Sequence, residues 1–189
     1  MEKKVKILGI AGSLRKESYN RGLLKAALEV APADCSLEIF DLSDIPLYNQ
    51  DEETNFPKSV ANFKAKIRAA DAILFATPEY NYSIPGVLKN ALDWASRPYG
   101  DNAWDDKPVG IMGASPGLQG TSRAQYHLRQ VFVYLNMHPL NKPEIMIATA
   151  QDKFDAKGNL TDPKARQKIG ELLTALTACA MTRCTKVKS

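Results

Sequence analysis

Short apolar runs alternate along the chain with segments in which apolar residues recur at helical spacing. Continuous or alternating apolar runs that end near Gly, Pro or Ser are typical of strands. They predict strands over residues 5–11, 36–42, 72–78, 107–115 and 144–149. The segments with one apolar face predict helices over residues 23–31, 57–70, 85–95, 121–135 and 163–181.

This order of elements predicts a doubly wound α/β fold, because each strand is followed by a helix. Such strands pair in parallel through right-handed crossovers, and their helices cover both faces of the sheet. Ligands then bind beyond the carboxyl ends of the strands, where the strand order reverses. We therefore expect a site at the loops over residues 12–20, 77–84 and 114–121.

Length and composition indicate one domain. The chain has 189 residues, of which 44% are hydrophobic, and this is enough for one sizeable core. No internal repeat or linker divides the sequence, so we expect a single domain over residues 1–189. No run approaches the roughly 18 apolar residues of a transmembrane helix, so we expect no membrane span.

Charge and metal-ligating residues exclude other classes of protein. The net charge of +4 is mild and dispersed, which predicts no nucleic-acid partner. The three cysteines, Cys35, Cys179 and Cys184, form no C-x-x-C pair and are odd in number, so neither a disulfide framework nor a zinc site is indicated. His127 and His138 have no Cys or Glu at ligand spacing, and we expect no metal site.

The start of the chain imitates a secretory signal, with lysines before an apolar run. Gly9 and Gly12 interrupt that run, however, and Arg15, Lys16 and Glu17 stand where a small-residue cleavage site is needed. Together with the lack of a disulfide framework, this predicts a cytoplasmic protein.

The loop "GSLRKESYN" at residues 12–20 carries the hydrogen-bond donors Ser13, Arg15, Ser18 and Asn20. It leads into a helix, whose N-terminus favours an anion. The glycine patterns of a pyrophosphate site and of a nucleoside triphosphate loop are both absent, so the loop suits a phosphate monoester. The alternative is that Ser18 or Asn20 only caps the helix.

Two further loops can complete a pocket for a flat phosphorylated ligand. The stretch "TPEYNYSIPG" presents residues 79–82 in a tight turn, whose planar side chains and N–H groups suit a heterocycle with polar edges. The loop "ASPGLQGTS" has Gly117 and Gly120, which let the backbone approach a ligand. The alternative for each loop is an ordinary turn.

With these motifs the sequence resembles the NADPH-dependent FMN reductases, in particular the branch of chromate and quinone reductases and related azoreductases. The resemblance runs through "ILGIAGSLRKESYN", "TPEYNYSIPGVLKNALDW", "QYHLRQVFVYLNMHPLNKPE" and "FDAKGNLTD". It implies a flavodoxin-like sheet with strand order 2-1-3-4-5 and a tightly held FMN. It also implies electron transfer from NADPH or NADH to a quinone, azo compound, chromate or flavin.

By the same resemblance, particular residues of the three loops are expected to bind FMN. They are Ser13, Arg15, Ser18 and Asn20 for the phosphate, Pro78, Glu79, Tyr80 and Asn81 along the isoalloxazine ring, and Ser115 and Gly117 at its other polar edge. The chemistry belongs mainly to the cofactor, so no catalytic side chain is expected. Glu79 is a candidate for proton transfer, although a carboxylate in a turn is more often solvated or paired.

Two other functions share the predicted fold. A flavodoxin-type electron carrier would bind FMN without turning over a substrate, but carriers of that type generally have an acidic surface and a phosphate loop without an arginine. The positive net charge and Arg15 argue against it. A binding module without activity is the third possibility, because fold does not prove activity.

The long irregular stretch "SDIPLYNQDEETNF" bears on assembly. Its apolar residues are poor choices for a solvated surface, so the stretch folds back on its own subunit or packs on a partner. The resemblance implies a homodimer or homotetramer with Tyr48 or Tyr82 near the flavin. Arg123, Tyr126 and Glu144 are candidate interface residues, although Arg123 and Glu144 could instead form an exposed ion pair.

Overall fold

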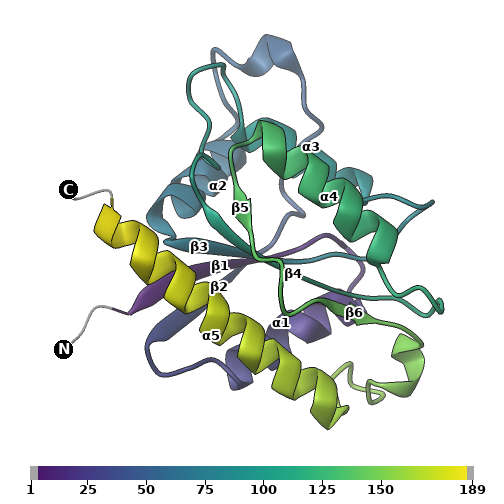
Figure 1. The fold of residues 1–189 in the computed structure, drawn as a ribbon. Helices are drawn as coiled ribbons and strands as arrows, with labels where there is room; N and C mark the ends of the chain where they lie inside the picture. Colours follow the sequence, from purple (N-terminus) through teal and green to yellow (C-terminus); the bar gives the residue numbers. More distant parts are fainter. Residues whose placement is uncertain (1–3, 187–189) are drawn as a thin grey trace.

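The computed structural model describes residues 4–186, and its strands form one sheet (Figure 1). The order is β2-β1-β3-β4-β5, with β6 also pairing with β4, and every pairing is parallel. This confirms the doubly wound fold and the order 2-1-3-4-5. The strands are β1 (Val5–Ala11), β2 (Cys35–Phe40), β3 (Ala72–Ala76), β4 (Pro108–Ala114), β5 (His138–Pro139) and β6 (Ile145–Ile147).

The last position of the sheet differs from the sequence prediction. Two short strands occupy it in place of one strand over residues 144–149: β5 pairs with the start of β4 and β6 with its end. Pro139 and Pro143 lie at the end of β5 and just before β6, and proline has no N–H to donate to a ladder. The interruption therefore follows from the two prolines.

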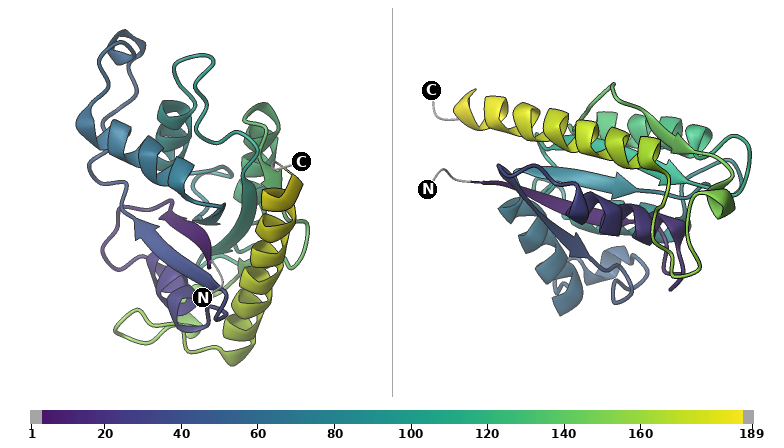
Figure 2. Two further views of the ribbon diagram at one scale, coloured as in Figure 1. Left: turned by 90° about the vertical axis from the view of Figure 1, so that its left-hand side faces the viewer. Right: turned by 90° about the horizontal axis from the view of Figure 1, so that it is seen from below.

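Within the described part of the chain, five α-helices cover the two faces of the sheet. In Figure 1, α1 and α5 lie against one face and α2, α3 and α4 against the other, and Figure 2 shows the same layers from two further sides. None of the helices within residues 4–186 combines the length and the apolar character needed to cross a membrane. The helices are α1 (Tyr19–Glu29), α2 (Lys58–Ala69), α3 (Gly86–Ala95), α4 (Ser122–Tyr134) and α5 (Pro163–Lys186), with 3-10 turns η1 (Gln50–Glu52) and η2 (Ala150–Asp152).

The core is divided by the sheet into two layers. Successive strand residues point to opposite faces, so Ile7 packs with α1 and α5, whereas Leu8 packs with the other three helices. Every residue of β3 is fully buried. The near-continuous apolar runs of the sequence are therefore explained by strands that are covered on both faces.

The long connection between β2 and α2 folds back on its own chain. Asn90 of α3 accepts the backbone N–H of Tyr48 at 2.7 Å and donates to the carbonyl of Pro46 at 2.7 Å. The Trp94 indole donates to the same carbonyl at 2.9 Å, and its ring packs against Tyr48 and Phe56. The packing within one subunit accounts for Ile45, Tyr48 and Phe56, whereas Leu47 is 85% exposed, so packing of the stretch on a partner stays a prediction.

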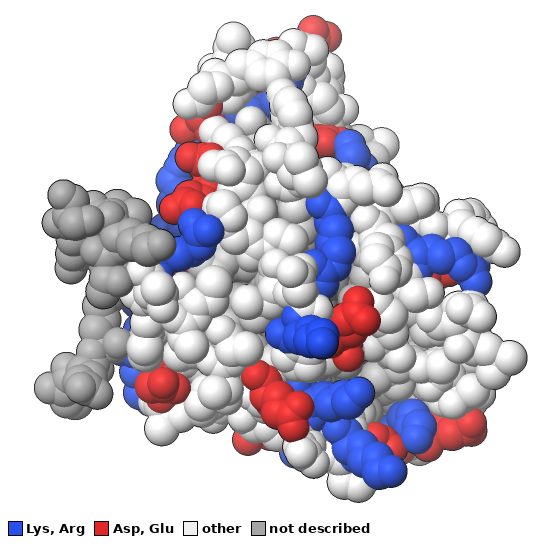
Figure 3. Space-filling model, in the orientation of Figure 1, with Lys and Arg blue, Asp and Glu red and all other residues white. Residues whose placement is uncertain are grey.

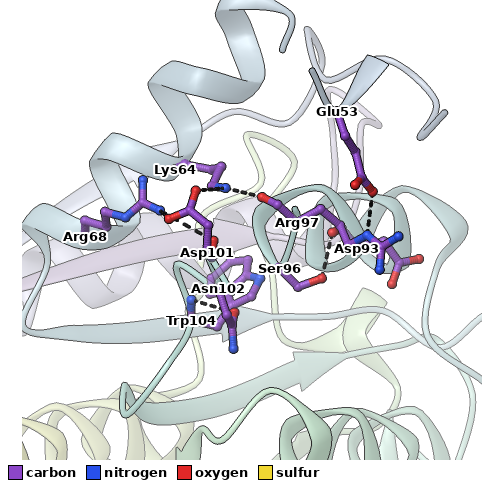
Figure 4. A network of polar contacts seen from close by, with 9 residues as sticks. All are labelled: Glu53, Lys64, Arg68, Asp93, Ser96, Arg97, Asp101, Asn102 and Trp104. Atoms are coloured by element: carbon purple, nitrogen blue, oxygen red, sulfur yellow. Dashed lines mark hydrogen bonds and ion pairs between the residues drawn. The ribbon is translucent and has the colours of Figure 1, made fainter. Parts of the chain in front are cut away.

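A polar network ties this connection to the loop after α3 (Figure 4). The ammonium of Lys64, whose side chain is only 4% exposed, lies 2.7 Å from a carboxylate oxygen of Asp101 and also donates to the carbonyl of Arg97. Arg68 pairs with the same Asp101, and Arg97 pairs with Glu53 at 2.5 Å. The hydrogen bond from Lys64 lowers the pKa of the Asp101 carboxyl below its ordinary value.

On the face shown in Figure 3, basic and acidic side chains lie next to one another, and much of the remaining surface is uncharged. Many of the charges are paired, as in Arg166 with Glu29 and Lys153 with Asp162. The mild positive charge is thus dispersed on this face, as the sequence suggests.

Candidate functional site

The three loops that follow β1, β3 and β4 converge on a shallow pocket of about 100 Å³. This is the carboxyl edge of the sheet, where a doubly wound fold binds its ligands. Eight of the ten predicted residues line the pocket, whereas Asn81 and Gly117 lie in the same loops outside the lining. The eight are Ser13, Arg15, Ser18, Asn20, Pro78, Glu79, Tyr80 and Ser115.

Ser13 and Ser18, in the loop that leads into α1, each carry a hydroxyl that can donate to an anion. Ser18 is the N-cap residue, and its oxygen accepts the N–H of Asn20 at 3.2 Å. The oxygen of Ser13 accepts the N–H of Arg15 at 3.3 Å, and both serines are buried. Each hydroxyl accepts a bond and retains its hydrogen for donation, so capping and anion binding are compatible here.

The guanidinium of Arg15 stands at the rim of this pocket. Its side chain is 61% exposed, and its nearest carboxylate, that of Glu17, is 3.7 Å away. An exposed ion pair of that length contributes little, so Arg15 can turn toward an anion at low cost.

The side chain of Asn20 joins two loops of the site, which the sequence did not reveal. Its amide oxygen accepts the N–H of Ala114 at 3.0 Å and its amide nitrogen donates to the carbonyl of Ala114 at 3.0 Å. The side chain is buried, so it ties the first turn of α1 to the end of β4. One amide hydrogen remains for an anion, and the predicted contact with a phosphate stays a prediction.

The second loop closes as a two-residue hairpin turn. Tyr80 and Ser83 exchange both backbone hydrogen bonds at 3.0 Å. Asn81 and Tyr82 between them have φ of 51° and 68°. Positive φ is common for Asn but costly for a bulky residue, and such strain concentrates at functional sites. Tyr82 lies beside the pocket residue Tyr80, and its predicted proximity to the flavin remains a prediction.

Glu79 is paired within the protein. One of its carboxylate oxygens accepts the N–H groups of Arg123 at 3.0 Å and Ala124 at 3.1 Å, and the other lies 3.1 Å from the Arg123 guanidinium. The side chain is 9% exposed. Glu79 therefore caps α4 from a distant loop, which favours the paired interpretation over proton transfer.

Arg123 extends this cluster to the turn. Its guanidinium stacks on the ring of Tyr82 at 3.8 Å from the centroid. Within residues 4–186 the carboxylate partner of Arg123 is Glu79 and not Glu144, which was considered from the sequence. These contacts, from Tyr82 through Arg123 to Glu79, hold the strained turn against the start of α4.

The third loop is held by the end of β6 and by the turn that follows it. Ser115 donates its N–H to the carbonyl of Ile147 at 3.0 Å, and its own carbonyl accepts the N–H of Ala150 at 3.1 Å. The Ser115 hydroxyl accepts the N–H of Gly117 at 3.2 Å. Periodicity gave no signal for this support, because it joins residues more than thirty positions apart.

A phosphate monoester fits these residues. Two buried hydroxyls, one exposed guanidinium and the N-terminus of α1, which has no acid in its first turn, all suit an anion. The pocket's size of about 100 Å³ suits a phosphate group better than a whole flavin nucleotide. Tyr19, which also lines the pocket, was not singled out from the sequence.

The chain is similar in sequence and in fold to flavin-dependent and quinone-dependent oxidoreductases. The family model described as NADPH-dependent FMN reductase matches residues 5–152. An NAD(P)H-dependent FMN reductase of Pseudomonas aeruginosa is 56% identical over 93% of this chain and 95% of its own length. An NAD(P)H:quinone oxidoreductase of Solanum tuberosum is 48% identical over 94% and 93%, respectively. The solved structure of FerB, a flavoenzyme NAD(P)H:(acceptor) oxidoreductase from Paracoccus denitrificans, superposes with a TM-score of 0.86 at 35% identity, covering 94% of this chain and 98% of FerB.

Proposed function

The chain belongs to the family of NADPH-dependent FMN reductases, and we propose that it holds FMN at the pocket between the three loops and transfers two electrons from NADPH or NADH to a quinone. The observation that carries the proposal is the set of phosphate donors at the carboxyl edge of the sheet. Quinone is the acceptor class named in relatives at 45–48% identity.

When bound, FMN supplies the redox chemistry, since it accepts a hydride from a nicotinamide and gives two electrons to an acceptor. The residues of this chain bind and orient it. Ser13 and Ser18 would donate to its phosphate, and Arg15 would add a charge-assisted bond. Asn20 keeps the first and third loops at a fixed separation, and Glu79 fixes the turn of residues 80–83.

No described side chain at the pocket needs to act as an acid or base in this reaction. A quinone that receives a hydride equivalent gains its second proton from solvent, because the pocket lies at an open edge. Glu79 already accepts two N–H bonds and one guanidinium, which leaves it poorly placed to exchange protons. Azo compounds, chromate and free flavins remain further acceptors suggested by the resemblance.

The first test is turnover. The purified protein should be yellow, release FMN on denaturation and oxidise NADPH steadily when 1,4-benzoquinone is added. A flavodoxin-type carrier would bind FMN but would not sustain NADPH oxidation. A protein that takes up no FMN would refute the proposal.

We also propose a homodimer or homotetramer. Tyr126, Val133 and Tyr134 project from α4 into solvent, and Val133 is 82% exposed. Beside them, a groove of about 480 Å³ runs between α3, α4 and the long connection, and Tyr48 and Arg97 line it. An apolar stripe of this kind next to a groove supports self-association. Arg123, Tyr126 and Glu144 remain proposed interface residues.

We also propose a single domain and a cytoplasmic location. One sheet that includes every strand within residues 4–186 supports a single FMN-binding domain over residues 1–189. Cys35 and Cys179 are free thiols, in keeping with a cytoplasmic location.

A further inference from the structure

One segment of the resembling motifs, "FDAKGNLTD", lies outside the pocket and has no part in the proposed function so far. It forms a hairpin over residues 153–162, in which Phe154 and Leu160 pair as an isolated bridge. The carboxylate of Asp155 closes the turn by accepting the N–H groups of Lys157 at 2.9 Å and Asn159 at 2.8 Å. These bonds lower the pKa of the Asp155 carboxyl.

The hairpin rests on the first turns of α1. Phe154 is buried, and its ring centroid lies 4.9 Å from that of Tyr19. Gly22, one turn further on, has no side chain at the contact. A Cβ built there would lie 2.5 Å from the carbonyl oxygen of Gly158 and 2.8 Å from the Phe154 ring. Tyr19 directly follows the Ser18 cap, so the hairpin supports the residues that present the phosphate donors.

The same part of the chain reaches the opposite wall of the pocket. The 3-10 turn η2, just before the hairpin, begins with Ala150, whose N–H donates to the carbonyl of Ser115 at 3.1 Å. Thr149, which precedes it, has φ of 45°, an uncommon value for a β-branched residue. Residues 147–162 thus contact both the α1 wall and the Ser115 wall.

We infer that the 153–162 hairpin is a positioning element for the FMN phosphate, with Phe154 as its anchor on Tyr19 and Gly22. This rests on the proposed function. Hydrogen bonds to a phosphate weaken sharply when donors move by a fraction of an ångström, so donors at the end of a helix need a supported helix. Phe154 does not itself line the pocket, whereas Tyr19 does, so we expect it to act through its ring contact with Tyr19.

The alternative is that Phe154 only fills the core. The two roles predict different effects of a Phe154 substitution on the binding of flavins with and without the phosphate. A positioning role predicts that Phe154→Leu weakens FMN binding and leaves riboflavin binding nearly unchanged, because riboflavin lacks the phosphate. A purely structural role lowers stability without this selectivity. The matched control is Phe63→Leu, which removes the same ring from the core on the other face of the sheet.

The experiment titrates the apo forms of the wild type and both variants with FMN and with riboflavin, following flavin fluorescence at a temperature at which circular dichroism shows all three to be folded. For Phe154→Leu we expect the ratio of the riboflavin Kd to the FMN Kd to fall about tenfold, the loss of roughly one good phosphate hydrogen bond. Phe63→Leu should lower Tm and leave the ratio at the wild-type value.

A second variant keeps the inference testable if Phe154→Leu does not fold. Asp155→Ala removes an exposed carboxylate and loosens the hairpin without a cavity, so it should lower the ratio in the same direction by a smaller factor. If Phe154→Leu and Asp155→Ala both keep the wild-type ratio, or if Phe63→Leu lowers it equally, the inference is overturned. If the wild type itself does not prefer FMN to riboflavin, the proposed function fails instead, which is a separate result.

Discussion

The carboxylate of Glu79 accepts the backbone N–H of Arg123 at 3.0 Å while its other oxygen pairs with the Arg123 guanidinium at 3.1 Å. The turn after β3 and the start of α4 are therefore one unit, although they are far apart in sequence. This unit forms one side of the proposed cofactor site and has measurable consequences.

Replacing Glu79 by Gln should lower the free energy of unfolding by about 1 kcal/mol, the usual magnitude of a lost helix cap. The amide oxygen can still accept both N–H groups, but the amide carries no negative charge for the α4 N-terminus or for the Arg123 guanidinium. Urea denaturation measures the change, with Glu171→Gln at an exposed position of α5 as control. The pH profile of kcat should keep its shape in Glu79→Gln. If kcat of Glu79→Gln no longer fell at one end of the pH range where the wild type does, Glu79 would be assigned a role in proton transfer.

Arg15→Ala should raise the FMN Kd by about ten- to a hundredfold, since a charge-assisted hydrogen bond to phosphate contributes roughly 1.5–3 kcal/mol. Lys16→Ala is the matched control, because it removes an equal charge from the same exposed loop outside the pocket lining. Arg97 is a poor control, since it pairs with Glu53. Equal FMN dissociation constants for the two variants would show that Arg15 does not bind the phosphate.

The Lys64 and Asp101 pair predicts a specific dependence of stability on pH. The pKa of Asp101 is lowered in the folded protein, so its charge stabilises the fold above the unfolded value of about 3.9 and this contribution is lost as pH falls through the folded pKa. Asp101→Asn should cost about 1–2 kcal/mol at neutral pH, less than a fully buried pair, because Asp101 is half exposed. The difference from wild type should shrink in urea denaturation at pH values from about 5 toward 2. A constant difference would contradict the assignment.

Val133→Asp should shift the protein toward the monomer mass of 20.8 kDa in light scattering at micromolar concentration. A charge at the centre of an apolar contact is left unpaired when the contact forms. Thr174→Asp places the same charge on the exposed side of α5 and should leave the assembly unchanged. A monomeric wild type would refute the proposed dimer or tetramer.

The elements could be predicted because their signal is local. Each central strand is a continuous apolar run, and proline marks the start of α2 at Pro57 and of α3 at Pro85, both of which are N-cap residues. The carboxyl edge followed from the alternation of strand and helix, and that edge brings Ser13, Glu79 and Ser115 together.

The supports of the site could not be predicted, because they depend on contacts between distant segments. The sequence shows Asn20 as a donor near a helix start, but only the fold shows that both ends of its amide bond to Ala114. Similarly, Gly22 has the appearance of a weak helix residue until the hairpin is placed against it. Pro139 and Pro143 did carry a signal for the divided last strand.

The bond between Asn20 and Ala114 spans 94 residues of sequence, and the seat of Phe154 on Gly22 joins segments further apart still. During synthesis, loop 12–20 emerges early, but its walls arrive only with β4 and the hairpin. Contacts of this separation form late, because loop closure must precede them. The walls of the proposed FMN site are accordingly complete only after the hairpin has been synthesised, and a nascent fragment that ends before residue 150 lacks both the hydrogen bond from Ala150 to Ser115 and the contact of Phe154 with Gly22.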